Sequence, residues 1–144
     1  MPSLPAYRQL ETWQVAMTLV ENCYRATTGF PREELYGLTS QMRRAAVSIP
    51  ANVAEGYCRR SGKAYANHVG IALGSHGELE TYIELAYRLG FFTGHERERL
   101  EKEVGSVGRL LSALHRSLRQ RIRAEKASRK KNRDGQGQSN PAPE

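Results

Sequence analysis

Hydrophobic residues recur every three or four positions in four successive segments of this 144-residue chain. In the first segment, roughly residues 8 to 28, the repeating positions are Leu10, Trp13, Met17, Val20 and Tyr24. This spacing is typical of one apolar face of a helix, and the alternating β-branched runs that would indicate strands are missing from the sequence. Gly29-Phe30-Pro31 predicts the end of the first helix. The pattern therefore predicts an all-α chain.

The second segment begins near Arg32 and is interrupted by Pro50. Its core positions are predicted to be Leu35, Leu38, Met42, Ala45 and Ile49. A proline inside a helix removes one backbone donor, so we expect a kink that frees the carbonyl of Ala46. Asn52 takes the next core position, where its amide can satisfy freed backbone groups, and Gly56 predicts the end of the helix. A kink with a local cap is favoured over a ligand site.

Two further segments complete the pattern, the third from the N-cap Ser61 to Gly90 and the fourth from about Gly94. Their predicted core positions are Tyr65, Val69, Ala72, His76, Leu79, Ile83 and Ala86, then Leu100, Val104, Val107, Leu111, Leu114 and Leu118. Short turns predict an antiparallel up-down four-helix bundle over residues 1 to 118. Residues 119 to 133 are expected to extend the fourth helix, and residues 134 to 144 to be disordered.

Basic residues are unevenly distributed along the chain. The formal net charge is +7, yet residues 1 to 114 carry 13 Lys and Arg against 12 Asp and Glu, whereas residues 115 to 144 carry 9 against 3. A basic end of this kind favours an anionic partner. On the fourth helix a basic stripe lies away from the leucine seam and consists of Arg109, Arg116, Arg119, Arg123, Lys126, Lys130 and Arg133. It is broadened by Arg121, Arg129 and Lys131.

We interpret this stripe as a surface for the phosphates of RNA or DNA. Glu125 is the only acidic residue between positions 116 and 133, which argues against the alternative of an ordinary solvated face of mixed charge. Aromatic residues are scarce there, so backbone contact is expected rather than base stacking. Further basic residues precede the third helix or are predicted to point outward from the second: Arg59, Arg60, Lys63, Arg43 and Arg44.

Three glycines of the third helix, Gly70, Gly74 and Gly77, fall on the side away from its core seam. Each glycine inside a helix costs about 1 kcal/mol relative to alanine, so close approach by another subunit would explain them. We expect an oligomer interface on this face, with solvent-exposed glycines as the alternative.

The sequence offers little for catalysis or cofactor binding. Cys23 and Cys58 are interpreted as ordinary thiols, and His76 with Glu80 fits a hydrogen-bonded core histidine better than a metal ligand. No metal or other cofactor is expected. Arg109 and His115 have the loose Arg-x(4 to 6)-His spacing of HEPN-type ribonucleases. A ribonuclease using these two residues is therefore one alternative function.

The cellular location is predicted from the absence of a membrane-spanning segment and of a secretory signal. No apolar run approaches the ~20 residues that span a bilayer, so no membrane contact is expected. The first residues, Met1 to Pro5, lack the basic and apolar regions of a secretory signal. We therefore expect a cytoplasmic protein.

The segment ELYGLTSQMRRAAVSIPANVAEG, residues 34 to 56, strongly resembles a bacterial family of four-helix-bundle proteins encoded within intervening sequences of 23S ribosomal RNA genes. The block ALGSHGELE, residues 72 to 80, followed by residues 85 to 90, is similar to the third helix of that family. Together the resemblance covers about residues 7 to 118. It implies an antiparallel four-helix subunit that assembles as a ring-like homopentamer, with no catalytic residues.

The leucine seam that begins at Gly108 and runs into a Lys- and Arg-rich end resembles one subgroup of that fold, the accessory variability determinant proteins of diversity-generating retroelements. That subgroup implies a reverse transcriptase as partner, together with nucleic acid. The SIPAN block at residues 48 to 52 is typical of the broader family, so involvement of a retroelement stays open. The favoured hypothesis is a non-catalytic, homo-oligomeric nucleic-acid-binding accessory protein, and a protein-binding scaffold without nucleic acid is the second alternative.

Overall fold

The computed structural model describes residues 4–137, and all regular structure in that part of the chain is helical. Two short 3-10 helices, η1 (Ala6–Gln9) and η2 (Arg32–Glu34), accompany four α-helices: α1 (Glu11–Thr27), α2 (Leu38–Cys58), α3 (Gly62–Arg88) and α4 (Gly94–Gly137). The prediction of an all-α chain is confirmed.

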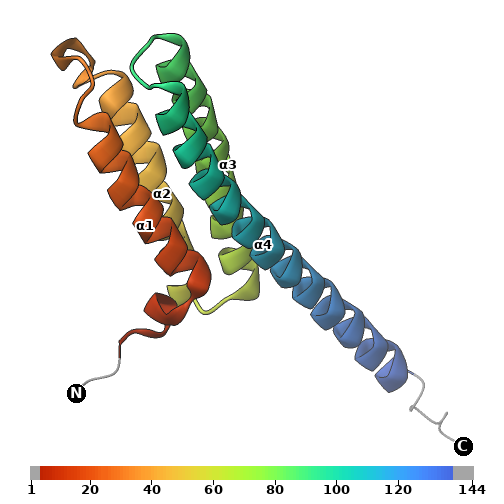
Figure 1. Cartoon of the computed structure of the whole chain (residues 1–144). Coiled ribbons are helices and arrows are strands. Elements are labelled where there is room, and N and C mark those ends of the chain that lie inside the picture. The colour runs from red at the N-terminus through yellow and green to blue at the C-terminus, as the bar shows by residue number, and fades with distance from the viewer. Residues whose placement is uncertain (1–3, 138–144) are drawn as a thin grey trace, which may run out of the picture.

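The four helices form an up-down bundle in which neighbours in the sequence are neighbours in space. The helix α1 packs against α2 and α4, and α3 packs against the same two helices. Successive helices run in opposite directions, with the α1–α2 and α3–α4 connections at one end of the bundle (Figure 1). This is the antiparallel four-helix bundle that the sequence predicts. Within residues 4–137 no helix has the length and apolar character needed to cross a membrane.

Local signals at the helix ends account for the boundaries of α3 and α4. The Ser61 side chain accepts a hydrogen bond from the backbone N–H of Ala64 at 3.3 Å, as expected for an N-cap. Thr93 and Glu96 exchange side-chain and backbone hydrogen bonds of 2.7 and 3.1 Å in a capping box at the start of α4. Gly90 ends α3 with a φ of 78°, which a glycine adopts without strain.

The bundle core follows the predicted seams in α2, α3 and α4 but not in α1. The fully buried positions of α1 are Ala16, Leu19, Cys23 and Thr27, whereas the predicted core residue Tyr24 is 43% exposed. Three of these four residues are small, which lets the neighbouring helices approach closely, whereas Trp13, Met17 and Val20 lie half-buried at the edges. The predicted seam of α1 is therefore wrong by one residue.

Three predictions about α2 need correction. Leu35 precedes the helix and is 50% exposed. Asn52 donates to the carbonyl of Ser48 at 2.8 Å, rather than to the carbonyl of Ala46 that Pro50 leaves without its helical donor. Gly56 does not end the helix, which continues to Cys58; it is buried where α2 meets α3, and a Cβ there would lie 2.8 Å from the Cβ of His68.

The last helix extends well past the bundle, as its blue end in Figure 1 shows. Ile122 still packs against the core, so α4 contributes to the bundle beyond the predicted boundary at residue 118. From residue 123 onward every described residue is exposed. The helix continues through Gly137, which corrects the prediction of disorder for residues 134 to 137, and residues 138 to 144 lie outside the described part of the chain.

Candidate nucleic-acid interface

The facing parts of α3 and α4 contain no acidic residue. Neither residues 62–77 of α3 nor residues 104–124 of α4 include Asp or Glu. Three contacts place these stretches side by side and antiparallel: the position of a Cβ at Gly62 is 3.8 Å from Ile122, that at Gly70 is 3.8 Å from His115, and His76 donates to the carbonyl of Val104 at 2.8 Å. Cations along this line therefore have no carboxylate neighbour on either helix.

Two pockets follow one another where α3 meets α4. The first, about 480 Å³, is lined by Leu73 and His76 of α3 and by Gly105, Gly108, Arg109, Ser112 and Arg116 of α4. The second, which we call the His115 pocket, is about 530 Å³ and is lined by Lys63, Ala66, Asn67, Gly70, Ile71, His115, Arg119 and Ile122. The first three arginines of the basic stripe thus adjoin α3, and none of the residues lining either pocket is acidic.

Beyond Ile122 the stripe continues along the projecting part of α4. Arg123, Lys126, Lys130 and Arg133 are all exposed, and from Arg116 to the last of them the helix rises about 26 Å at 1.5 Å per residue. The additional cations Arg121, Arg129 and Lys131 are exposed as well, because no other helix of the bundle covers this segment. No salt bridge neutralises these side chains within residues 4–137.

The first turn of α3 brings one further cation to the base of the projection. Lys63 lines the His115 pocket together with Arg119 of α4. Arg60 is exposed in the connection between α2 and α3 and has a φ of 54°. Arg59 is engaged differently: it donates a 3.0 Å hydrogen bond to Glu55, and this bond lowers the pKa of that carboxyl.

Arg43 and Arg44 do not join the basic stripe, although the sequence placed them among the nucleic-acid contacts. Arg43 does not point outward, because it donates to Thr27 at 2.9 Å and its guanidinium lies 4.5 Å from the centre of the Tyr24 ring. Arg44 is exposed in a separate pocket between α2 and α3 that also contains Glu78. These two residues are therefore removed from the candidate interface.

The three glycines of α3 occupy two different environments. Gly74 and Gly77 are exposed, and a Cβ added at either would meet nothing within 4 Å. Gly70 is half-buried and lines the His115 pocket, so it faces α4 rather than open solvent. Only Gly74 and Gly77 thus remain candidates for an open interaction face.

The residues considered for catalysis or metal binding do not form a common centre. Arg109 lines the first α3–α4 pocket and His115 the second, so the two do not converge as a ribonuclease pair would. His76 is a structural residue, since its Nε2–H donates to Val104 and its Nδ1 lies 3.1 Å from Glu80. Burial raises the pKa of the Cys23 thiol to about 12. No three potential metal ligands cluster within residues 4–137.

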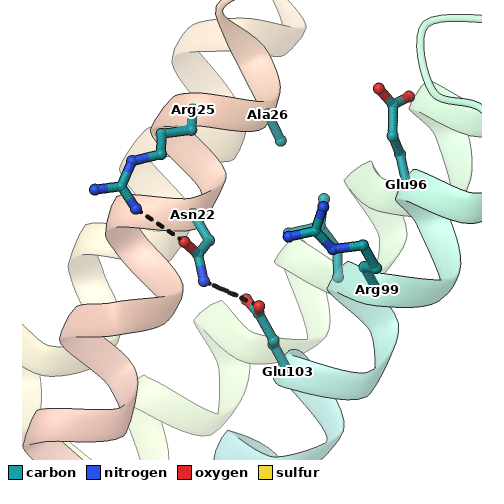
Figure 2. Close-up of a pocket in the computed structure, with 7 residues that line it drawn as sticks. Asn22, Arg25, Ala26, Glu96, Arg99 and Glu103 are labelled. Atoms are coloured by element: carbon teal, nitrogen blue, oxygen red, sulfur yellow. Dashed lines mark hydrogen bonds between the residues drawn. The ribbon is translucent and has the colours of Figure 1, made fainter.

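A further pocket of about 290 Å³ lies between α1 and α4, on the half of the bundle away from the projection. Figure 2 shows its polar side chains bonded to one another: Arg25 donates to Asn22 at 3.2 Å, and Asn22 donates to Glu103 at 2.9 Å. Glu96 and Arg99 also line it. Because carboxylates and guanidinium groups balance here, this pocket has no preference for a polyanion.

Sequence reasoning found the stripe on α4 but missed the contribution of α3. The sequence pattern gives no functional signal for Asn67, Ile71 or Ile122, and it indicates His115 only as a candidate catalytic residue. The absence of acids from residues 62–77 can be read from the sequence. Which part of α4 faces that stretch depends on the register between the two helices, which the hydrophobic spacing does not determine.

Comparison with known proteins agrees with the fold. A protein of unknown function from the S23 ribosomal protein family of Bacteroides thetaiotaomicron superposes with a TM-score of 0.68 at 20% identity, covering 73% of this chain and 95% of that one. No curated protein sequence matches the chain. The family described as 23S rRNA-intervening sequence protein matches residues 8–113. Since this match spans most of the bundle, the chain belongs to the 23S rRNA-intervening sequence protein family.

Proposed function

We propose that this protein is a non-catalytic accessory protein that binds RNA or DNA by its phosphates and acts as a homo-oligomer. The observation that carries the proposal is the line of cations that begins between α3 and α4, where the facing stretches lack acids, and continues along the projecting helix, where Glu125 and Asp134 are the only acids among the described residues. Along this line Arg109, Arg116 and Arg119 are followed by the exposed cations beyond Ile122. A polyanion lying there meets positive charge with no compensating carboxylate until Glu125.

The spacing of the charges fits contact with a phosphate backbone. Duplex DNA carries one negative charge per about 1.7 Å of axis, so a track of roughly 26 Å passes many phosphates. If the seven cations of the stripe each met a duplex phosphate, log K against log salt would have a slope of about −6. Because the exposed track lacks aromatic residues, it supplies affinity without reading bases.

Assembly would strengthen binding of this kind. The resemblance implies a homopentameric ring, and the open face at Gly74 and Gly77 is the surface we assign to contact between subunits. Several projecting helices on one ring would bind one nucleic acid multivalently, so a modest affinity per helix would become a higher overall affinity. A reverse transcriptase as protein partner stays a prediction from the resemblance to retroelement accessory proteins.

The decisive experiment compares two variants with the same loss of charge. In the first, Arg123, Lys126 and Lys130 are changed to Gln; in the matched control, Arg32, Arg99 and Lys102, which lie on the other half of the bundle, are changed to Gln. Binding of a labelled duplex is followed by fluorescence anisotropy across a salt series. We expect the first variant to lose affinity and its salt slope to become shallower by about 3, with the control close to wild type.

Three outcomes would contradict the proposal. Binding that does not respond to salt would rule out phosphate contacts as its basis. Equal losses in the two variants would show that net charge matters and the position of the cations does not. If no nucleic acid binds to a well-folded protein, the protein-binding scaffold becomes the better account.

A further inference from the structure

The His115 pocket differs chemically from the rest of the proposed interface. Along the projecting helix the exposed cations line a pocket of about 770 Å³ that is formed by residues of α4 alone, with no apolar side chain larger than Ala127, which suits contact with a phosphate backbone. The His115 pocket instead lies between α3 and α4, and its volume of about 530 Å³ falls in the range of sites that enclose small ligands. Its lining combines two cations, Lys63 and Arg119, with the amide of Asn67, apolar residues of both helices and one imidazole.

The imidazole of His115 is available to a ligand. The residue is half-buried, and it has no hydrogen bond to any other residue in the described part of the chain. His76, on the same pair of helices, is by contrast held by Val104 and Glu80. Gly70 leaves the space beside the His115 ring open because it has no side chain. Even a methyl group there would be in van der Waals contact with the ring, at 3.8 Å from Nε2.

The apolar wall and the cations suit two parts of one nucleotide. Ile71 is 46% exposed, and together with the half-buried Ile122 it forms an apolar surface beside the imidazole. Unpaired bases are held in proteins by stacking on flat side chains, histidine included, and by apolar contact. Lys63 and Arg119 are placed to bind the adjoining phosphate, and the Asn67 amide can bond to a base edge or a sugar hydroxyl.

We propose that the His115 pocket binds one unpaired nucleotide at the point where the duplex held by α4 ends. This inference rests on the proposed function, because the duplex is bound by the projecting helix and the pocket lies at the base of that helix. It adds a preference that the stripe alone cannot supply. The preferred nucleic acid is then a junction of paired and unpaired strand rather than a continuous duplex.

The test uses the full chain and two labelled probes, a short blunt duplex and the same duplex with one unpaired nucleotide at one end. Binding is measured by fluorescence anisotropy at one salt concentration. We expect the junction probe to bind about fivefold tighter or more, the lower end of what stacking one base contributes. RNA and DNA versions of both probes, each with a 5′ or a 3′ unpaired nucleotide, show which sugar and which strand end the pocket accepts.

Variants that leave the charge unchanged separate the pocket from the stripe. Gly70→Leu fills the space beside His115, and Asn67→Ala removes an exposed amide without disturbing the core. Thr81→Leu, at an exposed position of the same helix, is the matched control. We expect the first two variants to bind both probes equally, at the affinity of wild type for the blunt duplex, and the control to keep the preference.

The outcomes distinguish the two proposals. If neither probe binds in a salt-dependent way, the proposed function fails and this inference fails with it. If wild type binds both probes tightly and equally, or if Gly70→Leu and Asn67→Ala keep the preference, the stripe is supported and the pocket proposal alone is overturned. A preference that both pocket variants lose and Thr81→Leu keeps supports the assignment.

Discussion

The contact between α3 and α4 depends on a matched pair, His76 and Gly108. The imidazole Nε2–H donates to the backbone carbonyl of Val104 at 2.8 Å, so the ring lies directly over α4. A Cβ on Gly108 would come within 2.6 Å of the same nitrogen. The histidine ring therefore occupies the space that a side chain at position 108 would take. Gly108 lies one turn along α4 from Val104, whose carbonyl accepts the hydrogen bond.

We expect Gly108→Ala to destabilise the bundle by about 1–3 kcal/mol, the usual cost of forcing extra atoms into a packed contact. In an open helical position the same change would stabilise by about 1 kcal/mol. Urea unfolding followed by circular dichroism measures the difference. The same substitution in a His76→Ala background should be nearly harmless, because the ring is gone. A stable Gly108→Ala single variant would show that the contact is looser than described.

The sequence predicts part of this arrangement. Spacing places His76 on the core side of the third segment and Glu80 one turn later, which is enough to favour a structural histidine over a metal ligand. The partner of the ring is a backbone carbonyl, and backbone groups carry no signature in a sequence. The sequence therefore does not show that Gly108 contacts the His76 ring, and Gly108 appears only as a residue beside the leucine seam.

Among the helices, α4 has two parts that are stabilised differently. Up to Ile122 its apolar face is buried in the bundle, whereas every described residue of the segment that follows is exposed. That segment depends on local propensity, and it is rich in Arg and Lys, which favour helix. Its helical form aligns the cations, because residues three and four apart share a face only in a helix.

Ala127→Pro tests whether the helical form of the projection matters for binding. Proline removes a backbone donor and clashes with the preceding turn, which breaks the stripe without changing its charge. We expect the affinity for a labelled duplex to fall severalfold and the free energy of unfolding of the bundle to stay within about 0.5 kcal/mol. Ala127→Ser is the control. Undiminished binding by the proline variant would mean that a flexible basic segment serves as well.

How well each helix is predicted depends on where its large residues lie. In α2, α3 and α4 the large aliphatic residues of the seam are themselves buried, as Ile49, Leu79 and Leu111 are, so spacing identifies the core. In α1 the small residues Ala16, Cys23 and Thr27 share the centre with Leu19, while Tyr24 lies outside with its ring centre 4.5 Å from the guanidinium of Arg43. The spacing of large hydrophobic residues assigns the wrong face of such a helix to the core, because small residues lie where the helices pack most closely.

At the scale of the whole molecule, charge is segregated between the two halves of the bundle. The facing stretches of α3 and α4 nearest the projection lack acids, whereas Glu96, Glu98, Glu101 and Glu103 crowd the first turns of α4. Arg97, Arg99 and Lys102 nearly balance these four carboxylates. A polyanion is therefore attracted to the half of the bundle nearest the projection, which orients it along the projecting helix. The net charge of +7 predicts an anionic partner, but only the antiparallel packing of the helices reveals this polarity.

The open glycine face on α3, at Gly74 and Gly77, is the surface that we assign to contact between subunits. Gly74 and Gly77 have nothing within 4 Å of an added Cβ, so an isolated bundle would gain about 1 kcal/mol from Gly74→Ala by helix propensity. A subunit packed closely against this face would instead be displaced by a larger side chain. We expect Gly74→Leu to shift the mass measured by multi-angle light scattering from an oligomer to a single chain, while Ala127→Leu on the projection leaves the oligomer intact. If the wild-type chain is already monomeric and Gly74→Leu merely stabilises it, these glycines are exposed to solvent and form no interface. The multivalent binding expected of a ring then has no basis.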